Sequence, residues 1–432
     1  MYRKWFFALA SLLVVLTCTP RASHDVTDRS AESELQALLD EAVAGGIPGI
    51  SAAVATKDGV VWTGVAGEAD LQAGAPVHPD MLFGIGSITK TFVAVAILQL
   101  VEEGRLDLNA TPEKLLGTAV EGIPNANKST VAQLLNHTGG VPSWEDDPAW
   151  IHHGRGDQLD VSRIWDKTAT LPYIKGHAPL ARPGEKYSYA NTNFTLLGMI
   201  IEQVTGQEAV DEIHRRIRRP LGLKDIYLEG FEPVPLSKLP HRYHWATPAF
   251  RQNAGINQAF PEVRGGLIDA SHSNLSVEWT AGGMVATARD LALYAVALRD
   301  GRLLSSQSME FMTEWSPADE GWQVGHNLFR HQYPDGLAVV GHDGDVLGFS
   351  AALYWVEDTD TVVAVLCNVG SMHSGKVPGT AYSVLEKREF IDLAVRVAPS
   401  NGLILRRASG AMPLNIEFFT LPRIHRTVLA PR

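Results

Sequence analysis

The chain has 432 residues, of which 45% are hydrophobic and 20% charged, a composition ordinary for a globular protein of one or two domains. Its net charge of −11 argues against nucleic acid or an anionic membrane surface as the main partner. The two cysteines are Cys18 and Cys367. Cys18 lies in a leader, so no disulfide is expected within the mature chain. Cys367 stands in an apolar run and is expected to be a buried thiol.

The first residues have the pattern of a secretory signal peptide. A short basic segment, 1–4, precedes the apolar run 5–16, which is too short to span a bilayer comfortably. We expect residues 1–22 to be the signal peptide and 23–30 to be a linker, which predicts a secreted or periplasmic mature protein. Lipoprotein anchoring at Cys18 is the alternative. No other segment predicts a membrane span.

Helical and strand periodicities alternate along the rest of the chain. Helices are expected over 30–44, 87–104, 130–136, 193–205, 210–218, 287–301, 305–313 and 382–397. Strands are expected within 48–67, around the turn Lys57-Asp58-Gly59, and over 337–341, 349–356 and 361–368.

Strands near both ends of the chain, with helices between them, predict an α/β (α+β) fold around a central antiparallel sheet. We expect one compact domain over 31–398. Its sheet lobe would comprise 31–86 and 275–398, and its mostly helical lobe 87–274. Irregular loops over a cleft are expected at 229–277, and a C-terminal tail at 399–432.

The helix predicted over 87–104 begins with chemically active side chains. Ser87 and Lys90 are three residues apart, so both lie on one face of its first turn. A hydroxyl then stands beside an amine at the positive end of the helix dipole, near unpaired backbone N–H groups. A buried lysine there can lose its proton near neutral pH and activate the serine. Spacing alone is weak evidence, because an N-capping serine followed by a solvated lysine has the same pattern.

Two further motifs follow Ser87-Ile-Thr-Lys90 in a fixed order, namely Tyr189-Ala-Asn191 and His342-Asp-Gly344. With the flanking segments 134–142 and 281–290, these motifs make the chain resemble the serine β-lactamase and penicillin-binding protein family. The resemblance covers about residues 31–398. It is closest to the branch of class C β-lactamases, D-alanyl-D-alanine carboxypeptidases and related esterases. It implies a β-lactamase/transpeptidase-like fold and an acyl-enzyme mechanism.

The resemblance also implies roles for the residues of the first two motifs. Ser87 would attack the substrate carbonyl, and Lys90 would either hold a positive charge or act as a base. Lys90 and His342 would make the phenolate of Tyr189 easier to form, so that Tyr189 could take the Ser87 proton and return one to the leaving group. Asn191 would hydrogen-bond the substrate amide. The alternatives are a surface tyrosine at 189 and a helix cap at 191.

The third motif would serve both catalysis and substrate binding. The family resemblance places an oxyanion hole at the backbone N–H groups of Ser87 and Asp345, beside Gly344. His342 would be catalytic, or else a loop histidine before a glycine turn. Relatives that recognise penicillin often have Thr or Ser where this chain has Asp343, and that hydroxyl helps to hold the substrate carboxylate.

Asp343 therefore predicts a different substrate preference. Asp343 and Asp345 would repel a bound carboxylate, unless a protonated His342 or Arg330 offsets their charge, or unless Asp343 simply pairs with His342. We expect poor handling of β-lactams and a preference for a peptide, amide or ester that lacks the carboxylate.

Other candidate residues have weaker support. His137-Thr-Gly139 matches the usual third motif better than His342-Asp-Gly344 does, but it comes too early and follows a helix, so a structural role is expected. Trp279 is predicted to line the substrate cleft, with a core position as the alternative. His152-His153 is expected to be a surface pair. Neither His-Glu-x-x-His nor Cys-x-x-Cys occurs, so no metal or other cofactor is expected.

The leading functional hypothesis is a secreted serine hydrolase of D-amino-acid peptides, most simply a D-alanyl-D-alanine carboxypeptidase. Its partners would be a small peptide, amide or ester substrate, with peptidoglycan as a larger candidate. The first alternative is a β-lactamase or esterase of the same fold. The second is a non-hydrolysing penicillin-sensing or cell-wall-binding domain, although a pure binder need not keep Lys90 and Tyr189 together. The absence of Gly-x-Ser-x-Gly from the sequence disfavours a standard α/β-hydrolase.

Overall fold

The computed structural model describes residues 24–318 and 321–398, so the leader, Cys18 and the tail 399–432 lie outside the described residues. Within those ranges the largest sheet has nine strands in the order β10-β11-β12-β13-β14-β15-β1-β2-β3, all paired antiparallel. The two ends of the chain meet where β1 pairs with β15, with Ile50 opposite Cys367. The predicted central antiparallel sheet is thus confirmed.

The strands of the large sheet are β1 (Gly49–Thr56), β2 (Gly59–Asp70), β3 (Ala75–Pro76), β10 (Ser316–Pro317), β11 (Trp322–Val324), β12 (Phe329–Gln332), β13 (Ala338–Val346), β14 (Phe349–Val356) and β15 (Thr361–Cys367). A second sheet contains β16 (Val369–Gly370), β6 (Tyr243–Trp245), β8 (Leu267–Asp269) and β7 (Glu262–Arg264). A third contains β4 (Phe83–Gly84), β9 (Met284–Ala286) and β5 (Ile226–Leu228).

The α-helices are α1 (His24–Ala44), α2 (Thr89–Glu102), α3 (Pro112–Leu116), α4 (Val131–Leu135), α5 (Pro148–Gly154), α6 (Asn191–Thr205), α7 (Ala209–Ile213), α8 (Arg219–Leu221), α9 (Pro248–Asn253), α10 (Trp279–Gly282), α11 (Ala288–Arg299), α12 (Ser306–Met312), α13 (Ala381–Glu386) and α14 (Arg388–Val397). Short 3-10 turns are η1 (Gly86–Ile88), η2 (Gly117–Val120), η3 (Trp144–Asp146), η4 (Leu171–Ile174) and η6 (Leu236–Lys238), and η5 (His214–Arg218) is a π-helical turn.

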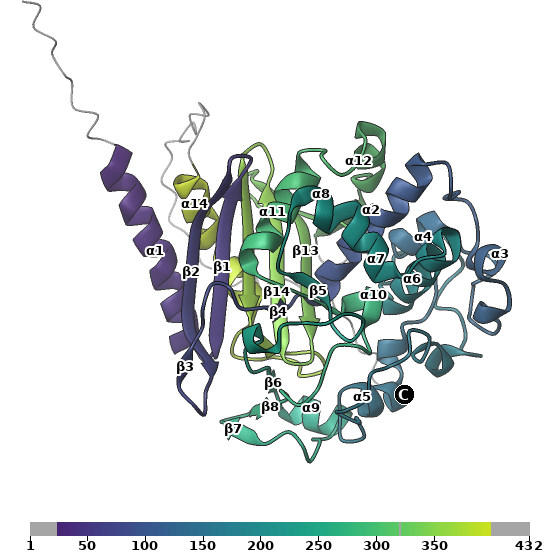
Figure 1. Cartoon of the computed structure of the whole chain (residues 1–432), viewed down its shortest axis with the longest axis horizontal. Helices are drawn as coiled ribbons and strands as arrows, with labels where there is room; N and C mark the ends of the chain where they lie inside the picture. The colour runs from purple at the N-terminus through teal and green to yellow at the C-terminus, as the bar shows by residue number, and fades with distance from the viewer. Residues whose placement is uncertain (1–23, 319–320, 399–432) are drawn as a thin grey trace, which may run out of the picture.

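The large sheet is covered on both faces, as Figure 1 shows. Helices α1 and α14 lie together on one face, whereas α11 and the helical lobe around α2 and α6 lie on the other. The two faces follow the period of a strand: Val363, Val365 and Cys367 of β15 pack with α1 and α14, and the residues between them pack with the helical lobe. Burial raises the pKa of the Cys367 thiol, which fits the predicted core position.

Helix α2 lies inside the helical lobe rather than on its surface. Every residue from Thr89 to Leu98 is buried, as is Leu100, so the helix lacks the polar face of a surface helix. Its start is also enclosed, because Gly86, Ser87 and Ile88 of η1 are buried. A charged side chain on the first turn of α2 therefore has no solvent to reach and must be neutralised or paired inside the protein.

Several local predictions are wrong. Residues 24–30, expected as a linker, form the first turns of α1. The closing helix expected over 382–397 is two helices, since Lys387 between them has extended backbone angles. The segment 229–277, expected to be irregular loops, is mostly irregular but also holds η6, α9 and three short strands of the second sheet, and it contributes most of a small hydrophobic cluster that includes Leu347. No helix among the described residues is long and apolar enough to cross a bilayer.

Candidate active site

Ser87 and Lys90 are in contact at the entrance to helix α2. The amine Nζ of Lys90 lies 2.9 Å from the hydroxyl Oγ of Ser87 and donates a second hydrogen bond, 2.6 Å long, to the backbone carbonyl of Ala281. The Lys90 side chain is fully buried, and Ser87 is 4% exposed. The solvated lysine of the alternative interpretation is therefore excluded, and the amine is placed to exchange a proton with the serine.

The backbones of η1 and β13 touch beside this pair. A Cβ on Gly344 would lie 2.0 Å from the carbonyl oxygen of Ile85 and 2.9 Å from the backbone nitrogen of Ser87. A Cβ on Gly86, whose φ is +51°, would lie 2.7 Å from the backbone nitrogen of Asp345. Both positions therefore require glycine. The close approach brings the amide groups of Ser87 and Asp345 to one place, as a two-amide oxyanion hole requires.

Tyr189 reaches the same site from the residues just before α6. Its ring centroid is 5.0 Å from Lys90 Nζ, and its side chain is hydrogen-bonded to Ser87. Burial raises the pKa of Tyr189 well above its ordinary value, outweighing the lowering by the Ser87 hydrogen bond; Tyr187, Glu145 and Asp343 raise it further. The expected ease of phenolate formation is therefore wrong. Tyr189 is a neutral phenol at ordinary pH and can donate a proton.

The rings of two histidines lie near the Tyr189 ring. That of His137 stacks on it with centroids 4.2 Å apart, and Nδ1 of His137 accepts the backbone N–H of Ala190 at 3.1 Å. The predicted structural role of His137 agrees with these contacts, but its position against Tyr189 was not foreseen. His342 is fully buried on strand β13, with its ring centroid 6.5 Å from that of Tyr189. It is therefore not a loop histidine.

Three predicted substrate-binding side chains are otherwise engaged. Asn191 opens α6 and is 3% exposed; its Nδ2 donates to Glu145 Oε2. The carboxylate of Asp345 accepts hydrogen bonds from the backbone N–H and the hydroxyl of Ser371, so only its backbone faces Ser87. Trp279 is 3% exposed in the core of the helical lobe, its ring centroid 6.2 Å from that of Phe231. The structure thus gives Trp279 the core position that was the alternative to cleft lining.

Asp343 is a buried carboxyl group next to the catalytic candidates. Its residue is 8% exposed, and its Oδ1 has no hydrogen-bond partner among the described residues. The alternative pairing with His342 is present only as a long contact: Nδ1 of His342 lies 3.9 Å from Oδ1, and the closer contact of Nδ1 is with the Asp343 carbonyl. Arg330 does not offset the charge either, because its guanidinium is bound to Glu357. Burial, and then the charge of Asp345, raise the pKa of Asp343 to about 7.

A buried charge cluster behind the site was missed by the sequence analysis. The guanidinium of Arg155 lies 2.9 Å from Glu145 and 2.8 Å from Glu278, and all three side chains are 1–3% exposed. Arg155 lies in a turn-rich stretch without a recognisable motif, so no local pattern marks it. The predicted surface pair, His152 and His153, lies nearby, with His152 bonded to Asp157. Among the described residues, no group of three His, Cys, Asp or Glu side chains could hold a metal ion.

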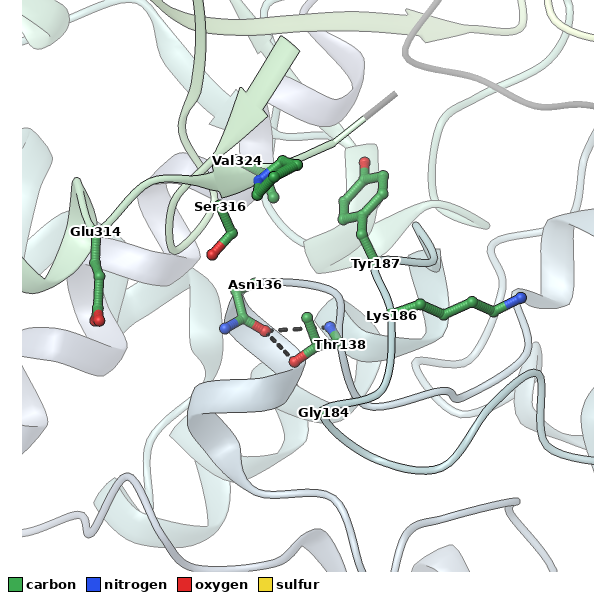
Figure 2. A pocket seen from close by; sticks show the side chains of 9 residues that line it. Asn136, Thr138, Gly184, Lys186, Tyr187, Glu314, Ser316 and Val324 are labelled. Carbon is green, nitrogen blue, oxygen red and sulfur yellow. Dashed lines mark hydrogen bonds between the residues drawn. The ribbon is translucent and has the colours of Figure 1, made fainter. Parts of the chain in front are cut away.

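A pocket of about 220 Å³ is lined by residues of the segments 136–138, 184–187 and 314–324, and none of the catalytic candidates lines it. Figure 2 shows Asn136, Thr138 and Tyr187 on one side of it and Val324 and Glu314 on the other. The ring of Tyr187 contacts that of Phe329, with centroids 6.4 Å apart, and Phe329 in turn contacts His342. These ring contacts link Tyr187, which lines the pocket, to His342 on strand β13. Segment 229–277, predicted to cover the cleft, does not line this pocket.

A family model described as Beta-lactamase matches residues 35–384. Among solved structures, a D-stereospecific amidohydrolase from Streptomyces sp. is 32% identical with a TM-score of 0.69, and the match covers 82% of this chain and 97% of that one. A D-amino acid amidase from Ochrobactrum anthropi SV3, complexed with L-phenylalanine amide, is 26% identical with a TM-score of 0.73, covering 86% and 100%.

A curated relative, the esterase EstB from Burkholderia gladioli, is 30% identical over 247 residues, which are 55% of this chain and 62% of the esterase. The chain therefore spans less than two thirds of that esterase, but nearly all of the two solved enzymes.

Proposed function

Since the chain belongs to the Beta-lactamase family and has the fold of its serine hydrolases, we propose that it forms an acyl-enzyme at Ser87 and hydrolyses D-aminoacyl amides, peptides or esters. The bond cleaved would join the D-aminoacyl group to a leaving group that carries no carboxylate near Asp343. Export through the leader 1–22 is part of the same proposal, with an anchor at Cys18 as its alternative.

The contacts at Ser87 support a specific proton path. Lys90 is the basic group within hydrogen-bond distance of the Ser87 hydroxyl, so its neutral amine accepts that proton as Oγ attacks the carbonyl. The amides of Ser87 and Asp345 stabilise the oxyanion. Neutral Tyr189 donates a proton to the departing nitrogen or oxygen, and the phenolate so formed is reprotonated from Lys90. Water then cleaves the acyl-enzyme by the reverse transfers.

The buried carboxyl of Asp343 is the observation that carries the substrate preference. It lies on β13 with Oδ1 lacking a hydrogen-bond partner; Nδ1 of His342 comes no closer to that oxygen than 3.9 Å, and Arg330 is bound to Glu357. Above pH 7 it is mainly ionised, so a substrate carboxylate brought beside it meets a like charge with little water between them. Such repulsion disfavours penicillins and peptides with a free C-terminus, and it leaves amides and esters unaffected.

Two of the solved relatives support this choice, because one is named a D-stereospecific amidohydrolase and another a D-amino acid amidase. A D-alanyl-D-alanine carboxypeptidase remains the second candidate, since its bond is also a D-aminoacyl amide. The difference lies in the leaving group, which in that reaction is an amino acid with a free carboxylate.

A matched pair of substrates tests the proposal. We expect kcat/KM for an acyl-D-alanyl-D-alanine amide to exceed that for the corresponding D-alanyl-D-alanine acid by at least tenfold at pH 8, and the preference to shrink at pH 6 as Asp343 becomes protonated. Nitrocefin and a p-nitrophenyl ester complete the panel, with Ser87→Ala as the inactive control. A preference for the free acid at both pH values would contradict the proposal.

Asp343→Thr sharpens the test, because it installs the hydroxyl found in penicillin-recognising relatives. We expect faster acylation by penicillin and a smaller amide-over-acid preference. Unchanged penicillin acylation would count against the role given to Asp343.

A further inference from the structure

We infer that Arg155, Glu145 and Glu278 form a positioning cluster. It orients Asn191 and the Ala281 carbonyl that binds Lys90, and it stabilises the charged form of Lys90. The inference rests on the proposed function of Ser87 and Lys90, although its test does not depend on which substrate the enzyme prefers. None of the three residues belongs to a sequence motif. Glu145 lies in η3, Arg155 just follows α5, and Glu278 just precedes α10.

In this cluster Arg155 binds two carboxylates, Glu145 and Glu278, which belong to separate segments of the chain; the two contacts are called the Glu145 arm and the Glu278 arm. One nitrogen of Arg155, Nη2, donates to Glu145 Oε1 at 2.9 Å and to Glu278 Oε1 at 2.8 Å. The side chains are 1%, 1% and 3% exposed, so water cannot replace any of the three partners. Removing one member of such a buried group leaves an uncompensated charge, which makes the arrangement tightly determined.

The Glu278 arm leads to Lys90. The N–H of Ala281 donates to the Glu278 carbonyl at 2.8 Å, and the Ala281 carbonyl accepts the Lys90 amine at 2.6 Å. Between them, Trp279 has a φ of +38°, a conformation that a non-glycine residue rarely adopts. The turn 278–281, whose last carbonyl binds Lys90, is therefore strained. The ion pair with Arg155 holds Glu278, the first residue of this turn, in place.

The Glu145 arm leads to Asn191. The second oxygen of Glu145, Oε2, accepts the side-chain N–H of Asn191, whose backbone N–H is held by the Ser143 hydroxyl at 3.0 Å. Arg155 thus fixes two groups of the site, each through one carboxylate. Through Glu145 it fixes Asn191, which is proposed to bind the substrate amide, and through Glu278 it fixes the Ala281 carbonyl, which binds the Lys90 amine.

The charges of the cluster bear on the protonation of Lys90. While Glu278 is ionised, Arg155 and a protonated Lys90 together balance Glu145 and Glu278, so the charged amine then completes a neutral set. Burial, and then the Glu145 charge, raise the pKa of Glu278 to about 7, against the lowering by Arg155 and Lys90. Two other groups face Lys90: Tyr189, which is neutral, and Asp343. Lys167 lies over the Trp279 ring and is paired with Glu202 and Glu208.

Glu278→Gln tests the electrostatic part of the inference. The substitution keeps the shape and removes one negative charge, so the ammonium form of Lys90 is destabilised. We expect the acid limb of the rate of Ser87 labelling by a fluorophosphonate, measured against pH, to move to lower pH by about one unit. Labelling needs no natural substrate, so an unlabelled wild-type Ser87 would refute the proposed function, whereas a labelled but unshifted variant would refute only the cluster's role.

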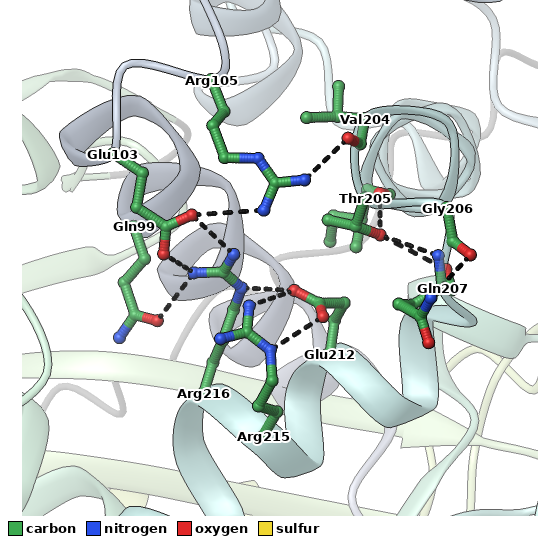
Figure 3. Close-up of polar contacts among 11 residues, drawn as sticks. Gln99, Glu103, Arg105, Val204, Thr205, Gly206, Gln207, Glu212, Arg215 and Arg216 are labelled. Atoms are coloured by element: carbon green, nitrogen blue, oxygen red, sulfur yellow. Dashed lines mark hydrogen bonds and ion pairs between the residues drawn. The ribbon is translucent and has the colours of Figure 1, made fainter.

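The matched control is Glu212→Gln on α7, whose partner Arg216 also binds Glu103 at the C-terminal end of α2. Figure 3 shows Glu212 bound to Arg215 and Arg216, and its side chain is likewise 3% exposed. This variant should lose thermal stability without moving the acid limb. An equal shift in both variants would overturn the inference.

Arg155→Lys provides a second measurement in case Glu278→Gln does not fold. Lysine keeps the positive charge but cannot hold both carboxylates in the same geometry. We expect kcat to fall by about tenfold or more with little change in KM, and the acid limb to stay in place. A wild-type kcat in a folded variant would show that the cluster positions nothing.

Discussion

Buried charged groups surround both ends of helix α2, but their pKa values are shifted in opposite directions. At the C-terminal end, Arg216 binds Glu103 with two nitrogens, at 2.6 and 3.0 Å, and also binds Glu212 at 2.6 Å (Figure 3). Glu103 is 38% exposed, so this cluster keeps one edge in water. The pKa values of both carboxyls are lowered. At Glu212 burial is the largest influence and opposes the lowering, but the hydrogen bonds and charges of Arg215 and Arg216 outweigh it; at Glu103 the hydrogen bond from Arg216 is the largest influence and again acts against burial.

At the N-terminal end the shifts run the other way. Burial raises the pKa values of Glu278 and Asp343 to about 7, because neither carboxyl reaches water and the nearby cations do not compensate fully. The contrast separates two uses of charged groups, which come from different elements, at the two ends of α2. Satisfied ion pairs at the C-terminal end fasten elements together, and incompletely compensated groups at the other end remain able to exchange protons.

The largest expected effect comes from Tyr189→Phe, which removes one hydroxyl from the N-terminal end. If this phenol donates the proton to the leaving group, kcat falls by about 10²–10⁴-fold in steady-state assays with a D-aminoacyl amide. The matched control is Tyr294→Phe, whose buried hydroxyl bonds Thr91 on the same helix at 3.0 Å. Both variants should lose about 1 kcal/mol of stability, but only the first should lose activity. Equal activity in the two would exclude Tyr189 from the proton path.

Arg216→Met breaks the cluster at the C-terminal end. Because Glu212 is 3% exposed, loss of the arginine leaves a buried carboxylate less well compensated, and the free energy of unfolding should fall by about 3 kcal/mol in urea titrations. The kcat of the folded fraction should stay at the wild-type value. A clear change in kcat would show that the two ends of α2 are coupled, which would contradict the division described above.

Asp343→Asn has the smallest expected effect, and the effect depends on pH. The folded-state pKa of about 7 lies above the ordinary value of about 3.9, so the folded protein holds this proton more tightly than the unfolded chain does. Wild-type stability therefore falls as pH rises from about 4 through 7, and asparagine removes that loss. The variant should match the wild type near pH 4 and exceed it by about 1–2 kcal/mol at pH 8, in denaturation curves at the two pH values.

Asp345→Asn is the control for that pair of measurements. Its carboxylate accepts hydrogen bonds from Ser371, so the substitution should reduce stability rather than increase it at pH 8. A stabilisation of both variants would mean that net charge, not the burial of Asp343, is responsible.

Local spacing carried the parts of the prediction that proved accurate. The strand expected over 349–356 coincides with β14, because an apolar run of that length between turn residues has few other solutions. The contact of Ser87 with Lys90 follows from their separation within one turn, wherever the helix lies. The spacing does not predict the burial of Lys90, because that burial depends on α2 lying inside the helical lobe rather than at its surface.

The environment of the site could not be read in the same way. The pKa of Tyr189 was predicted in the wrong direction because nearby cations were considered without the cost of burying a phenolate. Trp279 was placed in the cleft from its position before two glycines, but its contacts with Phe231 and Lys167 decide otherwise. Arg155 and its two carboxylates come from segments up to 133 residues apart, counting from Glu145 to Glu278, and no short pattern connects them.

The amino-acid sequence by itself determined the central strands β1, β2, β14 and β15, the helices α2, α6 and α11 and the three motifs, because these depend on periodicity and spacing within a few residues. Only the tertiary structure decided which groups near Ser87 are buried, which are paired, and in which direction their pKa values move. Those properties depend on the loss of water and on charges brought together from distant segments, and both exist only once the two lobes have packed around α2.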